Sequence, residues 1–232
     1  MEETMKEHYA VAIDGPSGAG KSSMAKKLAA RFGLIYVDTG AIYRTVGLAA
    51  WRRGLSCSDE EAVSRILPSL SIEIRYNEEG EQRMILNGED VSAEIRLPEI
   101  SICASDVSAL PAVRAFLLEM QRSLARSNRV VMDGRDIGTV VLPDAEVKIF
   151  LTASAKARAE RRLLQLEEKG VHTTFEEVLR DIEYRDKQDS SREIAPLRPA
   201  EDAVLVDSSD LDFDQTVDAL AGVLQEKLGI GG

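Results

Sequence analysis

The feature that most constrains this chain is a glycine-rich loop near its start, GPSGAGKS at residues 15–22. The loop fits the pattern G-x-x-x-x-G-K-[ST], follows an apolar run at residues 9–13 and precedes a helix-compatible run at residues 23–32. Between a strand and a helix, such a loop lets several backbone N–H groups point at one anion. The sequence therefore predicts a P-loop that binds ATP or GTP, in preference to an ordinary turn before a helix.

The residues of the loop have distinct expected roles. Lys21 is predicted to reach the terminal phosphates, and Ser22 to ligate Mg²⁺. The rest of the loop is predicted to surround the phosphates of ATP, and these residues are Gly15, Pro16, Ser17, Gly18, Ala19, Gly20 and Ser23. Asp14, directly before the loop, is a further candidate for supporting the metal's shell.

Composition narrows the class of protein. The 232 residues are 44% hydrophobic, enough for one compact domain with inserts or for a core with small mobile subdomains. The 29 basic and 40 acidic residues give a net charge of −11. That charge argues against a nucleic-acid partner. Residues 1–8 are charged and no run of 18 apolar residues occurs, so we expect a soluble cytoplasmic protein with no membrane partner. Cys57 and Cys103 lie far apart in the sequence and are expected to be separate thiols of a reducing compartment, without a disulfide or a zinc site.

Strand-like and helix-like runs alternate along most of the chain, which favours an α/β fold with a parallel sheet covered by helices. The expected strands are residues 9–14, 35–38, 129–133, 147–151 and 203–207. The expected helices are residues 41–53, 111–126 and 214–228. Residues 71–91 instead alternate apolar and polar side chains around turn signals at residues 77–80 and 87–88, which predicts a small antiparallel meander.

A charged stretch at residues 155–192 predicts a helical hairpin that closes over a site. Its helices are expected at residues 156–169 and 174–189, and Thr174 with Glu177 predicts a capping box. In the first of these helices, Arg158, Arg161 and Arg162 have the spacing of one face. This face is either solvated or directed at a transferring phosphoryl group.

A second stripe is expected at the end of the hairpin, where Arg185, Asp189 and Arg192 are spaced i, i+4, i+7. It is either a surface ladder of ion pairs or a set of donors and acceptors that closes over a second substrate. Asp133 and Arg135 follow an apolar strand, at the edge where α/β sheets bind ligands. They form either a polar turn or a site in which Asp133 holds metal-bound water and Arg135 grips a phosphate.

Another strand, at residues 35–38, leads into a helix that carries polar side chains. Thr39 is expected to cap this helix, and Arg44 lies one turn inside it. Arg44 would face the same strand edge as Arg135.

Five segments in order, IDGPSGAGKS, VDTGAIYR, DGRDIGTVVLPDA, RRLLQLEEKG and RDKQDSSREIAPLRPAEDA, closely resemble bacterial cytidylate kinases. The resemblance runs from Ala12 to Ser208. It implies a P-loop NTPase core at residues 8–38, 111–155 and 193–232, a monophosphate-binding domain at 39–110 with a β insert at about 70–98, and a helical lid at 156–192. It also implies Mg²⁺-dependent transfer of the ATP γ-phosphoryl group to CMP or dCMP, giving ADP and CDP or dCDP.

The resemblance further implies roles for single residues. Ser105, Arg114 and Asp136 would read cytosine, because the Asp136 carboxylate can accept from an exocyclic amine that uracil lacks. Thr39 keeps the hydroxyl of the serine expected at that position. The acceptor phosphate would be clamped by Arg44, Arg135 and Arg192. The sugar would be held by Tyr43, Arg185 and Asp189, and the lid residues that approach the transferring group would be Arg158 and Arg162.

A phosphate oxygen is already a nucleophile at neutral pH, so the implied reaction needs no general base. Catalysis is then assigned to charge neutralisation by Lys21, Arg135, Arg158, Arg162 and Arg192, with Mg²⁺. Two alternatives are a kinase for another monophosphate, such as UMP or AMP, and a nucleotide-dependent switch without a small acceptor. A monomer is expected, since no apolar helix face is left over.

Overall fold

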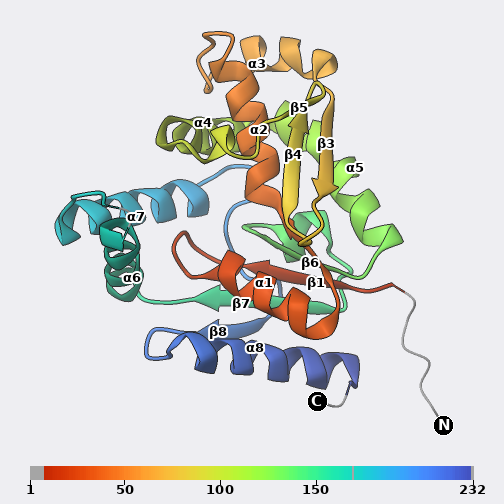
Figure 1. Cartoon of the computed structure of the whole chain (residues 1–232), viewed down its shortest axis with the longest axis vertical. Helices are drawn as coiled ribbons and strands as arrows, with labels where there is room; N and C mark the ends of the chain where they lie inside the picture. Colours follow the sequence, from red (N-terminus) through yellow and green to blue (C-terminus); the bar gives the residue numbers. More distant parts are fainter. Residues whose placement is uncertain (1–7, 169, 231–232) are drawn as a thin grey trace. The chain divides into compact units, whose positions relative to one another are not determined.

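The computed structural model of the chain describes residues 8–168 and 170–230 (Figure 1). The charged start at residues 1–7 and the expected helix end at Lys169 lie outside these residues. The chain divides into two compact units, the first made of Met1–Leu34 and Asn128–Gly232 and the second of Ile35–Ser127. The helix that starts at Pro111 thus belongs to the second unit, whereas the sequence-based boundaries assign it to the P-loop core.

Parallel strands form the centre of the first unit, in the order β6-β1-β7-β8. These strands are β1 (Ala10–Asp14), β6 (Val130–Gly134), β7 (Val147–Thr152) and β8 (Val204–Asp207). β1 is paired on both sides, with Val11 opposite Val131 and Val147. Every residue of β1 is buried, as expected for a strand that is covered on both faces. The carboxyl ends of β1 and β6 therefore place Asp14 and Asp133 at one edge of the sheet.

Helices cover this sheet. α1 (Lys21–Phe32) packs on β1 and β6, and α8 (Phe213–Leu228) packs on β7 and β8 and touches α1. A π-helical turn, η3 (Ile137–Val141), lies against β1 and β6. The expected parallel sheet with flanking helices is confirmed.

A helical hairpin completes the first unit (Figure 1). It consists of α6 (Ala155–Glu168) and α7 (Phe175–Ser190), which pack around Ala159, Val178 and Ile182. Thr174 and Glu177 form both hydrogen bonds of the predicted capping box at the start of α7. The hairpin thus has a small apolar core of its own and a fixed helix start.

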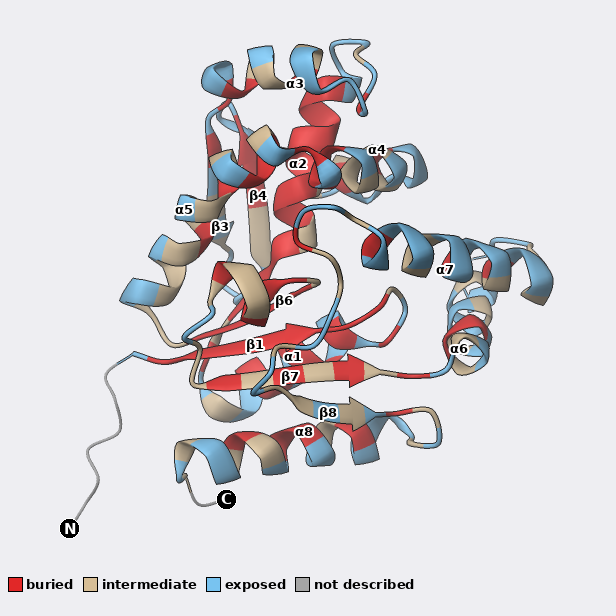
Figure 2. Ribbon diagram, turned by 180° about the vertical axis from the view of Figure 1, so that it is seen from behind, coloured by how far each residue is buried: buried red, intermediate tan, exposed pale blue. Residues whose placement is uncertain are grey.

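The second unit is built around one buried helix. α2 (Thr39–Trp51) follows β2 (Ile35–Asp38) and is buried at ten of its 13 positions, so it is red along most of its length in Figure 2. It packs against α4 (Pro98–Ala109), α5 (Pro111–Ser127) and the short turn η2 (Glu94–Arg96). Two further elements, not expected from the sequence, are α3 (Glu60–Ile66) and the turn η1 (Leu67–Ser69).

The predicted antiparallel meander is confirmed in the second unit. Its strands, in the order β3-β4-β5, are β3 (Ile72–Tyr76), β4 (Gln82–Leu86) and β5 (Glu89–Asp90). Asn87 and Gly88 both have positive φ, 50° and 86°, as a two-residue hairpin turn requires. β4 contacts both β2 and α2, and this contact joins the meander to the rest of the unit.

Two expectations about this unit are wrong. Thr39 does not cap α2: Asp38 is the N-cap, and its Oδ1 accepts from the Ala41 N–H at 2.8 Å. Asp38 is the capping residue because its backbone is extended, as an N-cap requires, while Thr39 is already the first helical residue. Cys57 and Cys103 are not separate thiols but form a disulfide, because folding brings their Cα atoms to 5.2 Å.

Within the described residues, no single helix is long and apolar enough to cross a membrane. α4 and α5 reach that length and composition only as a pair, and they are bent by 95°.

Candidate functional site

The loop between β1 and α1 owes its shape to glycine. Gly15 has φ 151°, and a Cβ at this position would collide with the carbonyl oxygen of Leu151 on β7. Gly18 and Gly20 also have positive φ, and Gly20 is the N-cap of α1. Because no side chain of the described residues caps α1, the N–H groups of its first turn remain available to an anion. This is the geometry expected of a phosphate-binding loop.

Lys21, the first residue of α1, is buried at 5% exposure, and its Nζ donates to the carbonyl oxygen of Pro16 at 2.7 Å. Burial, aided by the nearby positive charge of Arg135, lowers the pKa of Lys21 to about 7. The carboxylates of Asp133, Asp14 and Asp189 oppose this shift. The lysine is therefore poised to gain its full charge when an anion arrives.

Ser22 and Asp133, the two residues predicted to hold magnesium, are hydrogen-bonded to each other. The Ser22 hydroxyl donates to Asp133 Oδ2 at 2.8 Å, from the second residue of α1 to the end of β6. Both offer oxygen atoms, the ligand type that Mg²⁺ prefers, and Mg²⁺ commonly takes only one or two protein ligands beside phosphates and water. The described residues contain no group of three or more His, Cys, Asp or Glu that could hold a metal alone. The pair thus fits a magnesium ion that arrives with a nucleotide.

Asp14 is committed to the backbone of a neighbouring turn. Its Oδ1 accepts from the Ile137 N–H and its Oδ2 from the Gly138 N–H, both at 2.8 Å. The pKa of Asp14 is raised to about 6, chiefly by burial; the two hydrogen bonds act to lower it, and the charge of Asp136 acts to raise it. With both oxygens holding the turn that follows Asp136, Asp14 acts as an anchor for that turn. Its suggested role at the metal's shell has no support in this geometry.

Arg135, Asp189 and Arg192 form a second cluster in the first unit. Arg135 Nε donates to Asp189 Oδ2 at 2.6 Å, and Arg192 donates to Asp189 Oδ1 at 2.5 Å. Asp189 is buried at 5% exposure. Its single carboxylate thus aligns two guanidinium groups that come from different segments, one after β6 and one after α7. Two aligned guanidinium groups suit a phosphate with several oxygens.

The lid arginines do not share a role in this structure. Arg158 is buried and donates to the Ser17 carbonyl oxygen of the P-loop at 2.8 Å and to both oxygens of Asp186 on α7. Arg161 instead binds the carbonyl oxygens of Ser208 and Leu211. Their i, i+3 spacing therefore does not bring these two side chains to one ligand.

Two more lid arginines lie at the surface. Arg162 is exposed and makes no hydrogen bond or ion pair with other described residues. Arg185 pairs with Asp181, one turn earlier in α7, at 3.1 Å. The predicted stripe is thus divided, with Arg192 on Asp189 and Arg185 apart from it.

In the second unit, Asp38 gathers two arginines at the end of β2. Its Oδ2 accepts from Arg44 at 2.9 Å and from Arg96 at 3.0 Å. Burial acts to raise the pKa of Asp38, but Arg44 and Arg96 outweigh it, and the pKa lies below its usual value. The Arg44 Nε atom is buried and has no hydrogen-bond partner among the described residues. A buried N–H donor without an acceptor is what an anionic ligand would satisfy.

Tyr43, Ser105 and Arg114 are linked within the same unit. The Arg114 guanidinium lies 5.5 Å from the centroid of the Tyr43 ring and donates to the Ser108 carbonyl oxygen at 2.9 Å. Ser108 in turn donates to the carbonyl oxygen of Ser105 at 2.8 Å. Thr39 is buried at the start of α2, one turn before Tyr43. Tyr43, Ser105 and Arg114 thus come from α2, α4 and α5, which pack on one another.

Sequence reasoning missed four residues of these networks: Asp38, Arg96, Ser108 and Asp186. Asp38 carried a signal, because it ends a strand just as Asp133 does. Arg96 and Asp186 carried none, since each meets its partner only after folding, Arg96 from 58 residues and Asp186 from 28 residues away.

Comparison with known proteins gives one consistent result. The cytidylate kinase family model matches residues 11–226. The cytidylate kinase of Lactobacillus johnsonii is 48% identical over 217 residues, 94% of this chain and 94% of that protein. That of Caldicellulosiruptor bescii is 49% identical over 207 residues, covering 89% of this chain and 91% of the other. That of Geobacter sp. strain M21 is 48% identical over 222 residues, covering 95% and 94%.

Proposed function

Because the chain belongs to the cytidylate kinase family, it is a nucleoside monophosphate kinase that phosphorylates CMP, and we propose which residues do so. The proposed donor is ATP with Mg²⁺, and the proposed acceptors are CMP and dCMP, giving ADP with CDP or dCDP. ATP and CMP are its small-molecule substrates. A monomeric state and a cytoplasmic location stay predictions.

One observation carries the assignment of residues. Asp189 accepts from Arg135 at 2.6 Å and from Arg192 at 2.5 Å, and Arg135 and Asp189 are near enough to the buried Lys21 of the P-loop for their charges to act on its pKa. Cationic groups that converge beside a P-loop can neutralise the charge that develops on a transferring phosphoryl group. We assign this task to Lys21, Arg135 and Arg192, with Asp189 holding the two arginines in place.

Magnesium is assigned to Ser22, with Asp133 acting through a water molecule. When bound with ATP, the ion supplies positive charge to the phosphates. The 2.8 Å hydrogen bond between Ser22 and Asp133 supports this assignment, because it already directs the hydroxyl oxygen and the carboxylate toward each other.

The following residues are proposed to bind the acceptor. Arg44, with its unpartnered Nε, is proposed to bind the CMP phosphate. Tyr43 is proposed to support the sugar, and Ser105 and Arg114 the base. Arg185 is exposed and paired with Asp181, so its assignment to the sugar requires that it leave this partner.

Base selectivity is assigned to Asp136. This residue is buried at 4% exposure, and Asp14 fixes the backbone directly after it. A buried carboxylate accepts a hydrogen bond from the cytosine amine, whereas the uracil carbonyl at that position offers a second acceptor and no donor. Selection for cytosine then follows from one acceptor held in place.

In the proposed reaction the protein has to align the two nucleotides and neutralise charge, and it needs no general base. An oxygen of the CMP phosphate is already ionised, so no general base has to remove a proton. Arg158 is proposed to join in from the lid. Because it binds the Ser17 carbonyl oxygen and Asp186, it needs to exchange these partners to reach a nucleotide. Arg162, exposed and unpaired among the described residues, has no such obstacle.

An ADP-release assay tests the proposal. With MgATP, we expect high rates with CMP and dCMP and much lower rates with UMP, AMP and GMP. Equal rates with all five acceptors, or none above the rate without acceptor, would overturn the substrate assignment. Omission of Mg²⁺ should abolish transfer, and full activity without a divalent cation would remove the assignment of Ser22 and Asp133.

A further inference from the structure

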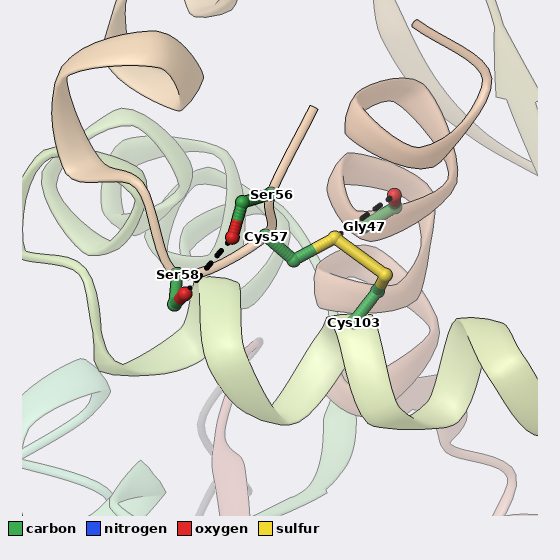
Figure 3. The surroundings of a disulfide bond; sticks show 5 residues. All are labelled: Gly47, Ser56, Cys57, Ser58 and Cys103. Atoms are coloured by element: carbon green, nitrogen blue, oxygen red, sulfur yellow. Dashed lines mark hydrogen bonds between the residues drawn. A yellow bond between two sulfur atoms is a disulfide. The ribbon is translucent and has the colours of Figure 1, made fainter. Parts of the chain in front are cut away.

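A disulfide joins two elements of the second unit, the loop after α2 and the helix α4 (Figure 3). Cys57 lies in the loop and is buried at 5% exposure, while Cys103 is half-buried on α4. The two cysteines are 46 residues apart in sequence, and α3 and the whole meander lie between them. Their Cα separation of 5.2 Å is within the range that a disulfide bridges without backbone movement.

The bond lies beside a close contact between α2 and α4. A Cβ at Gly47, in the middle of α2, would come within 3.1–3.2 Å of the backbone of Ala104 and the atoms of Cys103. Cys57 Sγ also lies 3.9 Å from the Gly47 carbonyl oxygen (Figure 3). At this point the backbone of α2 at Gly47 therefore packs directly on α4, and the disulfide links α4 to the loop that follows α2.

The clamped contact supports the residues proposed to bind the acceptor. Tyr43 and Arg44 lie about one turn before Gly47 on α2, and Ser105 lies two residues after Cys103 on α4. Ser105 is in turn linked through Ser108 to Arg114. A small change in the spacing of α2 and α4 would therefore move the groups on α4 relative to Tyr43.

We propose that Cys57 and Cys103 form a reversible redox site that tunes the affinity of this kinase for its monophosphate acceptor. The disulfide form holds α4 on α2 and binds the acceptor more tightly, and the dithiol form releases this clamp. This inference rests on the proposed function, because it takes Ser105, Arg114, Tyr43 and Arg44 as acceptor-binding residues.

The chemistry is a thiol–disulfide exchange with a small-molecule disulfide of the glutathione class. The Cys103 thiolate attacks the oxidant, forms a mixed disulfide and releases one small thiol. The Cys57 thiolate then displaces the second small thiol, so two protein thiols are oxidised and one disulfide is reduced to two thiols. Attack begins at Cys103 because it is the more exposed of the pair, and reduction by a small thiol enters by the same sulfur.

Two effects are expected on reduction. The melting temperature should fall by about 5 °C or more, because the bond closes a long segment of chain. The KM for CMP should rise about fivefold or more. The KM for ATP should not change, since the P-loop belongs to the first unit.

The test compares the full-length chain oxidised with glutathione disulfide and reduced with dithiothreitol. Free thiols are counted with a maleimide and mass spectrometry, and KM for CMP and ATP is measured in both states. Cys57→Ser, Cys103→Ser and the double variant are the controls, and each should have the kinetics of the reduced protein whatever the treatment. A Ser56→Ala variant, altered in the same loop but with both cysteines, should still respond to redox state.

The readouts separate the possible failures. Two reactive thiols after oxidation would overturn the redox site. A disulfide with no change in the CMP KM, or with equal changes for CMP and ATP, would overturn its role in acceptor binding. A third outcome is that the bond forms and shifts the melting temperature but no CMP is phosphorylated in either state. The proposed function then fails. The disulfide would be only a structural bond, and the proposed tuning of acceptor affinity would be overturned as well.

Discussion

Asp133 in the first unit and Asp38 in the second occupy the same kind of position, at the carboxyl end of a strand. The side chains that donate hydrogen bonds to them are of different kinds. Asp133 accepts from a neutral hydroxyl, that of Ser22, at 2.8 Å. Asp38 accepts from two guanidinium groups, those of Arg44 and Arg96, at 2.9 and 3.0 Å. Position on a strand therefore does not decide what a carboxylate does, and its neighbours do.

The difference follows from charge. The Asp133 carboxylate accepts from a hydroxyl and lies near the Lys21 side chain, and its oxygen atoms are of the type that Mg²⁺ prefers. A carboxylate between two arginines is neutralised, and its value lies in holding guanidinium groups ready for an anion. The first arrangement fits a donor nucleotide that carries magnesium, and the second fits the phosphate of an acceptor. Variants that affect one unit and spare the other can test this division.

The largest effect is expected from Lys21→Met in the first unit. Loss of the buried ammonium should lower kcat by about 10³-fold, because it is assigned to charge that develops on the transferring group. The fold should survive, since burial already disfavours the charged lysine. ADP release and a thermal melt measure the two properties. Lys27→Met, an exposed lysine on the same helix, is the matched control, and a similar kcat in both variants would contradict the P-loop assignment.

A smaller and differently shaped effect is expected from Arg44→Ala in the second unit. Removal of a guanidinium group from a phosphate should lower kcat/KM for CMP by about 10²-fold. The KM for ATP should stay within about twofold of the original value. Arg83→Ala is the control, because Arg83 also pairs with an aspartate of this unit, Asp90, but at the surface. A loss that falls equally on ATP and CMP would remove the proposed division between the two aspartates.

Asp14→Asn tests a carboxylate that holds backbone instead of a ligand. The amide keeps one acceptor and turns a donor toward the other N–H, so the turn after Asp136 should loosen and kcat/KM for CMP should fall about tenfold. The preference for CMP over UMP should narrow at the same time. Overall stability should change little, since the lost hydrogen bond is offset by removal of a charge that burial disfavours. Asp144→Asn, exposed beyond the same turn, is the control, and unchanged selectivity in Asp14→Asn would refute the anchoring role.

The smallest effect concerns protons. With a pKa of about 7, Lys21 is mostly neutral at pH 8 and mostly charged at pH 6 in the free protein. An anionic triphosphate favours the charged form, so ATP binding should take up as much as about one proton at pH 8 and almost none at pH 6. Calorimetry in two buffers of different ionisation enthalpy measures this uptake. Lys21→Met should abolish the pH 8 uptake, and uptake that persists in the variant would assign it to another group.

Local signals in the sequence predicted the regular parts of the fold. The P-loop pattern, the alternation at residues 71–91 and the Thr174–Glu177 capping box each depend on neighbours within a few residues, and all three are present. Helix α4 was missed because its buried side chains are few, and it is held mainly by tertiary contact with α2. The cap of α2 was assigned one residue too late, because aspartate and threonine both favour that position.

Contacts across long stretches of chain were beyond prediction. The Cys57–Cys103 pair depends on how closely α2 and α4 approach at Gly47, which no local pattern encodes. The partners of Arg158 are set in the same way, by the packing of α6 on α7 and on the P-loop. The sequence thus indicated which residues bear charge, and the fold decided which of these charges meet.

Gly15 limits how far the nucleotide loop can be redesigned. The obstacle to any larger residue there is the peptide of Leu151 on β7, a part of the sheet that no ligand displaces. Randomising position 15 in a search for new nucleotide preferences would therefore yield no useful variants. Every side chain larger than glycine would displace the loop from β7 and disturb it even without a bound nucleotide.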